Sequence, residues 1–215
     1  MPHILYKFAT RSRPEKYKAT IQNIQTLSRH SDYHILVSAD SDDPTMQDAE
    51  SSDKVTVMYG VSKSKIDAIN RDLPFNDWDI LVNISDDMVF TCEGFDLEII
   101  EAFGNNFDQF IHFPDGHTDI RLCSLSIIGR DYYERFGYIY HPDYVSLWCD
   151  NEALEVAQEL GKWKYIDKLI FEHKHPAWTG AKADDLLIKT QQYYRQDNRT
   201  YLRRKACGFP KHSVI

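Results

Sequence analysis

The sequence has few cysteines and no long apolar run, and both absences narrow the class of protein. Its four cysteines are widely spaced and form no Cys-x-x-Cys pair: Cys92, Cys123, Cys149 and Cys207. This argues against a zinc knuckle or a dense disulfide framework, so we expect reduced thiols. No segment approaches the roughly 18 consecutive apolar residues of a transmembrane helix. The first residues carry too short an apolar run for a signal peptide, so the expected location is cytoplasmic.

Positive charge and glycine-rich loops are also scarce. There are 25 Lys and Arg against 33 Asp and Glu, a net charge of −8 with neutral histidines. This balance argues against a protein that coats nucleic acid or an anionic membrane with its whole surface. The nine glycines form neither a Gly-x-Gly-x-x-Gly nor a Gly-x-x-x-x-Gly-Lys-Ser/Thr motif. Any phosphate site must therefore be local and must neutralise its ligand with other groups.

Alternating strands and helices are present instead. The 215 residues are 42% hydrophobic, which is enough to build one domain without a disulfide or structural metal. Strands are expected at 3–9, 34–39, 54–59 and 79–84, and helices at 14–29 and 64–72. The run at 79–84 is almost continuously apolar, as in a strand buried on both faces of a parallel sheet. The order predicts an α/β fold with a Rossmann-like, mostly parallel sheet flanked by helices.

The second half of the chain is less regular. Strands are expected at 109–113, 122–128 and 168–173, and helices at 130–136 and 150–161. From about residue 184 the chain is expected to be helical and to turn basic, with one acid among five cations over residues 195–205. The acid is Asp197, and the cations are Arg195, Arg199, Arg203, Arg204 and Lys205. This tail either binds an anionic substrate or is a solvated surface helix.

Acidic clusters follow two of the expected strands. Residues 40–43 come after the second strand, and residues 85–87 come directly after the fourth. Open α/β sheets bind ligands at the carboxyl ends of their strands, so position and charge agree. Adjacent carboxylates at a strand end point to opposite sides. Of Asp86 and Asp87, one is therefore expected to hold a divalent cation and the other to contact a sugar hydroxyl or a basic side chain. The alternative is an ordinary turn, in which Asp is common.

Four segments together resemble a known family. They are Ile-Leu-Val-Asn-Ile-Ser-Asp-Asp-Met at 80–88, Lys-Ser-Lys-Ile-Asp-Ala-Ile-Asn at 63–70, Asp-Asn-Glu at 150–152 and His-Lys-His at 173–175. In this order they look like a family 2 glycosyltransferase with the A-type (GT-A) nucleotide-sugar fold, over roughly residues 3–178. The resemblance implies one domain at 1–183, with a donor half of about 1–90 and an acceptor half of about 91–183, followed by the helical tail at 184–215.

The resemblance implies a divalent cation, Mn²⁺ or Mg²⁺, on the donor diphosphate. In the family the last aspartate of the short acidic motif coordinates it, and that residue is Asp87 here. Asp86 would lie near the donor ribose or sugar, while Ser85 stands where many relatives have an acid. A late metal-binding histidine of the family matches His175 or His173. These two alternate along an expected strand, so only one should reach the metal, and we favour His175.

The resemblance also implies contacts to the donor nucleoside. The matching positions are Thr10, Arg11, Asp40, Asp42, Lys63 and Asn70. In the family, the loop after the first strand and the acid after the second lie beside the base, which is expected to be uracil-like. Asp42 is the rival of Asp40 for this role. A solvated loop charge is an equally good interpretation of Lys63.

A general base is implied at the start of a late helix. Inverting members of the family use a carboxylate there, and Asp150 matches best, with Glu152 as the alternative. A helix cap is the structural interpretation of Asp150. Asp115, after a candidate strand, could bind the acceptor or the donor sugar, or simply form a turn. Trp148 is expected to stack on a sugar face if it is not part of the core.

The implied function is a metal-dependent, inverting, hexosyl-type glycosyltransferase. Its donor would be a nucleotide-diphosphate sugar, preferably a UDP-sugar, and its acceptor a glycan, a protein or a nucleic acid. A nucleotidyltransferase uses a similar sheet and metal but typically begins with a glycine-rich loop, which this chain lacks. A non-catalytic nucleotide-sugar-binding domain is the other alternative, favoured by Ser85, because a fold does not guarantee catalysis.

Overall fold

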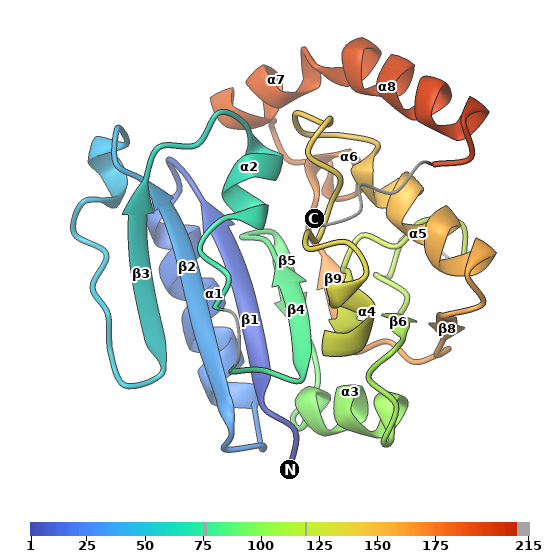
Figure 1. The fold of residues 1–215 in the computed structure, drawn as a ribbon. Helices are drawn as coiled ribbons and strands as arrows, with labels where there is room; N and C mark the ends of the chain where they lie inside the picture. The colour runs from blue at the N-terminus through green and yellow to red at the C-terminus, as the bar shows by residue number, and fades with distance from the viewer. Residues whose placement is uncertain (75–76, 119, 210–215) are drawn as a thin grey trace.

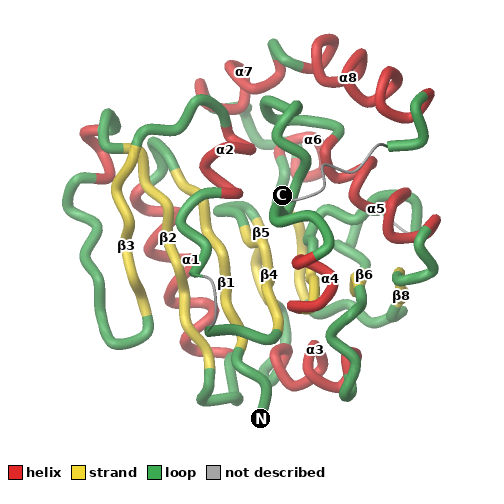
Figure 2. Tube along the Cα trace, in the orientation of Figure 1, coloured by secondary structure: helices red, strands yellow, loops and turns green. Residues whose placement is uncertain are grey.

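Strands and helices alternate along the first half of the chain, as expected. The computed structural model describes residues 1–74, 77–118 and 120–209. Its main sheet has seven strands, and helices cover both faces (Figures 1 and 2). The predicted α/β class is therefore confirmed. Within the described residues, no helix has both the length and the apolar character that crossing a membrane requires.

The main sheet is parallel on one side and mixed on the other. Its strands, in chain order, are β1 (Ile4–Thr10), β2 (Tyr33–Asp40), β3 (Val55–Gly60), β4 (Ile80–Ile84), β6 (Phe110–His112), β7 (Ile127–Gly129) and β8 (Trp163–Tyr165). The spatial order is β3-β2-β1-β4-β7-β6-β8. The first four are parallel, β7 runs antiparallel to β4 and β6, and β6 is parallel to β8. A second, two-stranded sheet pairs β5 (Met88–Phe90) antiparallel to β9 (Phe171–His173).

Helices pack on each face of the sheet. They are α1 (Pro14–Leu27), the 3₁₀ turn η1 (Pro44–Met46), α2 (Lys65–Asn70), α3 (Phe95–Phe103), α4 (Arg130–Glu134), α5 (Cys149–Glu159), α6 (Pro176–Thr179), α7 (Asp185–Gln191) and α8 (Tyr194–Ala206). One core lies against α1 and α3, and the other against α2, α4 and α5. In Figure 1, α7 and α8 run along the edge of the molecule at which β1, β2 and β3 end.

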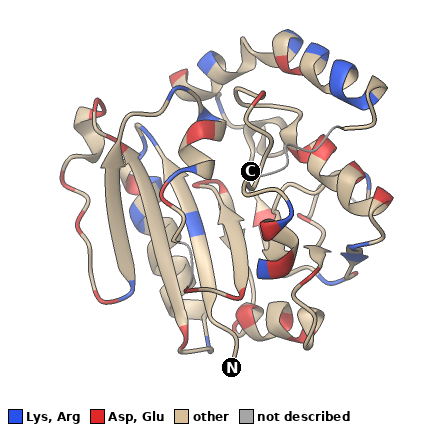
Figure 3. Ribbon diagram, viewed as in Figure 1, with Lys and Arg blue, Asp and Glu red and all other residues tan. Residues whose placement is uncertain are grey.

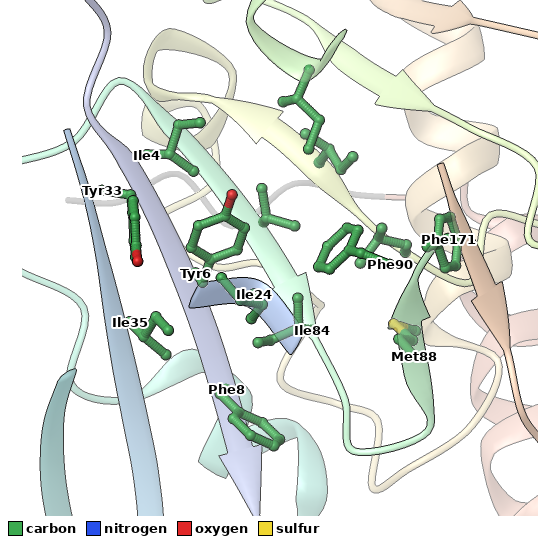
Figure 4. Close-up of a cluster of buried hydrophobic side chains, with 14 of the residues drawn as sticks. Ile4, Tyr6, Phe8, Ile24, Tyr33, Ile35, Ile84, Met88, Phe90 and Phe171 are labelled. Carbon is green, nitrogen blue, oxygen red and sulfur yellow. The ribbon is translucent and has the colours of Figure 1, made fainter. Parts of the chain in front are cut away.

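Strand β1 contributes buried side chains to both cores. Its residues Ile4, Tyr6 and Phe8 pack with Ile24 of α1 (Figure 4), while Leu5 belongs to the opposite core. Successive side chains of a strand point to opposite faces, so a strand buried along its length must lie in the middle of the sheet. Each large apolar side chain buried in this way contributes about 1.5–3 kcal/mol. The loop that follows β1 is therefore attached to a rigid, buried strand.

The strand order reverses beside β1. The chain moves outward from β1 through β2 to β3 and then crosses back, so that β4 pairs with the other side of β1. Loops after the two strands flanking such a reversal diverge to opposite faces of the sheet and leave a crevice at its carboxyl edge. The segments at 10–13 and 85–87 both start at this point.

The structure differs from the sequence-based expectation in the second half. Of the strand expected at 122–128, only residues from Ile127 onward are extended, because the preceding segment folds around Asp115, to which the Ser124 hydroxyl donates at 2.9 Å. The strand expected at 168–173 is shortened to β9 and lies outside the main sheet. Helix α3 was not expected. Its N-cap is Gly94, with φ 75°, so no capping side chain marks its start.

Candidate active site

Four segments meet at the carboxyl edge of the sheet. Residues 10–13 follow β1, residues 40–43 end β2, and residues 85–87 follow β4. The fourth segment arrives through β9, because His173 is the register partner of Met88 directly after the acidic motif. The backbone amide of Lys174 also donates to the carbonyl of Asp87 at 2.7 Å. Most of the residues predicted for the site are thus brought to one edge.

The side of the site next to β2 is organised by Arg11. Its Nη1 donates to Asp40 Oδ2 at 2.8 Å and to Asp42 Oδ1 at 2.6 Å, so the two rival acids share one guanidinium. Asp40 is buried and Asp42 is exposed. The second carboxylate oxygen of Asp40 and the hydroxyl of Thr10 are buried and have no hydrogen-bond partner among the described residues. Buried polar groups usually have a partner, so these two oxygens mark unsatisfied hydrogen-bonding capacity on this side of the site.

Arg71 lies on the same side but was not expected from the sequence. Its Nη2 donates to the carbonyl of Ala39 at 2.7 Å and lies 3.9 Å from Asp40 Oδ1. Its Nη1 donates to Asp72 at 2.6 Å. Arg71 directly follows the segment at 63–70, one of the four on which the resemblance depends. This position in the sequence could have identified it as a candidate site residue.

Lys63 flanks α2 and Asn70 belongs to it, and their roles as donor contacts stay predictions. Lys63 is exposed, and its backbone amide donates to Asp67. The side-chain amide of Asn70 donates to the carbonyl of Tyr140 at 2.6 Å and accepts from the backbone amide of Ile139 at 2.9 Å, which ties α2 to the loop between α4 and α5. The charge of Lys65, by contrast, acts to lower the pKa of both Asp87 and Asp150.

The centre of the site is an acid–histidine–acid group. His173 Nε2 lies 3.5 Å from Asp87 Oδ2, and its Nδ1 lies 3.6 Å from Asp115 Oδ2. Burial alone would favour a neutral histidine, but the two carboxylates outweigh it and raise the pKa of His173 to about 9. Burial also opposes the charge on Asp87, yet His173 and the Ser85 hydroxyl hold its pKa well below the ordinary value. Asp87 is therefore ionised at neutral pH.

Asp115 is more than a turn residue. Its Oδ1 accepts from the amides of His117 and Thr118 at 2.9 and 2.6 Å. Its other oxygen accepts from Ser124 and faces His173. Burial opposes ionisation, but these donors hold the pKa of Asp115 well below its usual range. Asp115 therefore both builds its loop and fixes the ring of His173.

Asp87 and His173 fit two ligands of a small divalent cation. One is an ionised oxygen ligand and the other an imidazole, and a cation bound to both would replace the proton that His173 now keeps. Within the described ranges, no group of three or more His, Cys, Asp or Glu is arranged to hold a metal alone. Mg²⁺ sites often use one or two carboxylates and complete the shell with substrate phosphates. His175 instead caps α6, with Nδ1 accepting from the Ala177 amide at 3.1 Å.

Asp86 contacts a basic side chain, whereas Asp87 faces His173. Arg13 Nη1 donates to Asp86 Oδ1 at 2.6 Å. The same guanidinium makes two 2.7 Å hydrogen bonds to Asp184, the N-cap of α7. Burial raises the pKa of Asp86 although Arg13 works against it. The two neighbouring aspartates thus lie in opposite environments, and Arg13 joins the acidic motif to the C-terminal segment.

The two candidate bases also differ. Asp150 lies in the first turn of α5, and the N-cap of that helix is Trp148, so Asp150 is not the cap. Burial raises the pKa of Asp150, while the charges of Lys65 and His173 act in the opposite direction. Lys65 also lowers the pKa of Asp87. These electrostatic effects connect Asp150 to the acid–histidine–acid group.

Glu152 is held in a buried ion pair. Arg204 of α8 donates to its carboxylate through Nε at 2.8 Å and Nη2 at 2.8 Å. Tyr144 donates to the same carboxylate at 2.7 Å. Because Glu152 already has these partners, the geometry favours Asp150 over Glu152 as the base.

Two tryptophans stand near the site. Trp148 packs against Tyr194 and Tyr201 of α8, with ring centroids 5.5 and 5.2 Å apart. Trp178 of α6, which the sequence analysis did not select, is 49% exposed and stacks on His117 at 5.6 Å with an interplanar angle of 10°. Trp178 therefore offers the more accessible aromatic face.

Three solved structures are similar to most of this chain. Glucosyl-3-phosphoglycerate synthase from Mycobacterium tuberculosis, in complex with Mn²⁺, UDP-Glc and phosphoglyceric acid, has a TM-score of 0.64 at 14% identity over 98% of this chain and 81% of that one. A mannosyltransferase from Pyrobaculum calidifontis in complex with GDP-Man and Mn²⁺ has a TM-score of 0.62 at 12% identity, over 82% of this chain and 58% of that one. The catalytic domain of Drosophila β1,4-galactosyltransferase 7 in complex with xylobiose has a TM-score of 0.58 at 12% identity, over 89% of this chain and 80% of that one.

Sequence comparison adds nothing to these likenesses. No protein-family model and no curated protein matches the chain. At identities this low, structural similarity establishes the fold and leaves the reaction to be argued from the site. The expected GT-A resemblance is confirmed, while assignment to family 2 stays a prediction. The chain has the α/β fold of the A-type nucleotide-sugar glycosyltransferases.

Proposed function

We propose that this protein is a hexosyl-type glycosyltransferase that uses a UDP-sugar and a divalent cation and inverts configuration. One observation carries the proposal. At the reversal point of a sheet shared with nucleotide-sugar enzymes, Asp87 is kept ionised beside His173, while burial raises the pKa of Asp150. A low pKa suits a cation ligand, and a raised pKa suits a general base.

The donor contacts follow from the unused groups on the side of the site next to β2. The Asp40 oxygen that has no hydrogen bond, 3.9 Å from Arg71 Nη2, would accept the N–H of a uracil ring, and the Thr10 hydroxyl would bond a neighbouring polar atom of the donor. Lys65 contributes positive charge near Asp87, where a diphosphate would need it. Asp87 and His173 would hold the cation, which as a Lewis acid would stabilise charge on the departing diphosphate.

The transfer step needs only one further group from the chain. Asp150 takes the proton of an acceptor hydroxyl as that oxygen attacks the anomeric carbon of the sugar. The bond between the anomeric carbon and the diphosphate oxygen breaks, and its electron pair leaves with the nucleoside diphosphate. A single displacement inverts the anomeric configuration, and such base catalysis contributes about 10²- to 10⁴-fold. The acceptor is a glycan, protein or nucleic-acid hydroxyl.

Donor binding is tested first by thermal unfolding with UDP-glucose, UDP-galactose, UDP-N-acetylglucosamine and GDP-mannose, each with and without Mn²⁺. A ligand at 100 times its dissociation constant adds about 2.7 kcal/mol of stability. We expect a Mn²⁺-dependent shift with a UDP-sugar, and its loss in Asp87→Asn with the unliganded melting curve nearly unchanged. Equal stabilisation of wild type and Asp87→Asn would overturn the cation assignment.

Turnover is tested next by following release of free sugar from the donor that binds. Slow, Mn²⁺-dependent hydrolysis without acceptor supports the enzyme, because water can replace the acceptor hydroxyl. Binding with no hydrolysis and no transfer to a glycan array would instead identify a non-catalytic sugar-nucleotide-binding domain.

A further inference from the structure

The acidic residue of helix α8 points into the protein. Asp197 is fully buried, on a helix whose other charged residues are basic (Figure 3). Its Oδ1 accepts from the amide of Val145 at 3.0 Å, and its Oδ2 accepts from the amides of Ser146 and Leu147 at 2.8 Å each. One carboxylate thus satisfies three consecutive backbone donors of a loop about 50 residues earlier in the chain.

That loop leads directly to Asp150. Trp148 follows it with φ 65°, a left-handed conformation that is uncommon for a residue other than glycine, and α5 starts at Cys149. Such a backbone persists only where its surroundings hold it. Here the three hydrogen bonds of Asp197 hold the preceding residues, and the ring of Trp148 packs on Tyr201 of α8. The direction of the first turn of α5 therefore depends on α8.

The basic residues of α8 anchor the helix at this place. Arg204 pairs with Glu152 in α5, Lys205 with Glu155 at 2.7 Å, and Arg203 with Asp143 at 2.9 Å. These three cations have acidic partners on the acceptor half. On the other side of the loop, the Val145 carbonyl accepts from the amide of Ile66 in α2 at 3.3 Å. The loop at 145–147 is thus held between α2 and α8.

We propose that α8 is a positioning element for the reaction and that Asp197 sets the place of Asp150 through the loop at 145–147. This inference rests on the proposed function, in which Asp150 is the general base. Asp197 does not itself touch substrate. Without its carboxylate the three amides lose their acceptor, the loop loosens, and Asp150 leaves the position from which it reaches the acceptor hydroxyl. A displacement of about 1 Å in a catalytic group can cost about 10²-fold in rate.

The test compares Asp197→Asn and Asp197→Ala with Gln196→Ala, a change at the exposed neighbour on the same helix. The asparagine variant keeps the shape but replaces one carboxylate oxygen by an NH2 donor, so at least one of the three backbone amides loses its acceptor. It remains informative if the alanine variant fails to fold. We expect kcat to fall about 10²-fold in Asp197→Asn, with the Michaelis constant for the donor within about twofold of wild type. Gln196→Ala should behave as wild type.

Amide hydrogen exchange provides a readout that does not depend on activity. In Asp197→Asn, exchange should become faster at 145–148 and stay unchanged in β1 and β4. Faster exchange with unchanged kcat would overturn the positioning role and leave the proposed function intact. An equal loss in kcat and donor affinity would also overturn it, because it would indicate general damage. Failure of the proposed function is recognised separately, from wild-type protein that neither binds nor turns over a donor.

Discussion

The proposed donor half (residues 1–90) and the proposed acceptor half (residues 91–183) hold their loops in different ways. In the donor half, β1 and β2 are seven and eight residues long and pair in parallel along a buried sheet. In the acceptor half, β6, β7, β8 and β9 have three residues each. There the loops are held by buried side chains from distant parts of the chain, such as Asp197 and Arg204. A long strand places its own loop, whereas a short one needs polar contacts from elsewhere.

The largest expected effect concerns the two carboxylates of α5. Asp150→Asn should lower kcat by about 10²- to 10⁴-fold with donor affinity nearly unchanged, because a base acts in the transition state. Glu152→Gln should mainly lower stability, because it removes the charge that Arg204 pairs with. Steady-state kinetics and urea unfolding of both variants distinguish the two effects. A larger loss of kcat in folded Glu152→Gln would move the base two residues along.

The second prediction concerns the ion pair that holds the tail to the acceptor half. Arg204→Ala leaves Glu152 charged and buried, so the free energy of unfolding should fall by about 3–5 kcal/mol. Arg203→Ala removes an exposed pair with Asp143 and should cost less than about 1 kcal/mol. Chemical denaturation measures both. Equal losses in the two variants would mean that burial does not distinguish these pairs.

A smaller effect is expected where the two halves meet, at His173. Its pKa is raised from 6.5 to about 9 in the folded protein, so the folded state binds the proton more tightly than the unfolded chain. This contribution is complete below pH 6.5 and is lost as pH rises through 9. Its upper limit is about 3 kcal/mol. Buried Lys7, whose pKa is lowered to about 7, adds a pH dependence of opposite sign to both proteins, so the comparison is made between them. Without divalent cations, wild type should lose stability relative to His173→Gln as pH rises from 6 to 10. An identical pH dependence in both proteins would refute the assignment.

Sequence patterns predicted the donor half better than the acceptor half for the same physical reason. The buried strands and the acidic residues after them follow from local hydrophobic patterns, and these brought Asp40 and Asp87 to one edge. Arg204, which pairs with Glu152, and Asp197, which holds the loop at 145–147, both come from α8, about 50 residues away, and no local pattern records such pairs. The charge of Lys65 rather than that of Lys63 lowers the pKa of Asp87, and the sequence did not distinguish these two lysines.

The smallest expected effect is at the rim of the acceptor half, on Trp178. Its ring stacks on His117 and is about half exposed, so one aromatic face is available to the C–H face of a sugar. Aromatic contacts of this kind contribute about 0.5–1.5 kcal/mol, so Trp178→Ala should raise the Michaelis constant for an oligosaccharide acceptor about 2- to 10-fold and leave kcat nearly unchanged. Trp178→Phe should retain part of the affinity, and Leu202→Ala, at an exposed position on α8, should have no effect. An unchanged Michaelis constant for the acceptor in Trp178→Ala would show that the acceptor does not bind to this face of the ring.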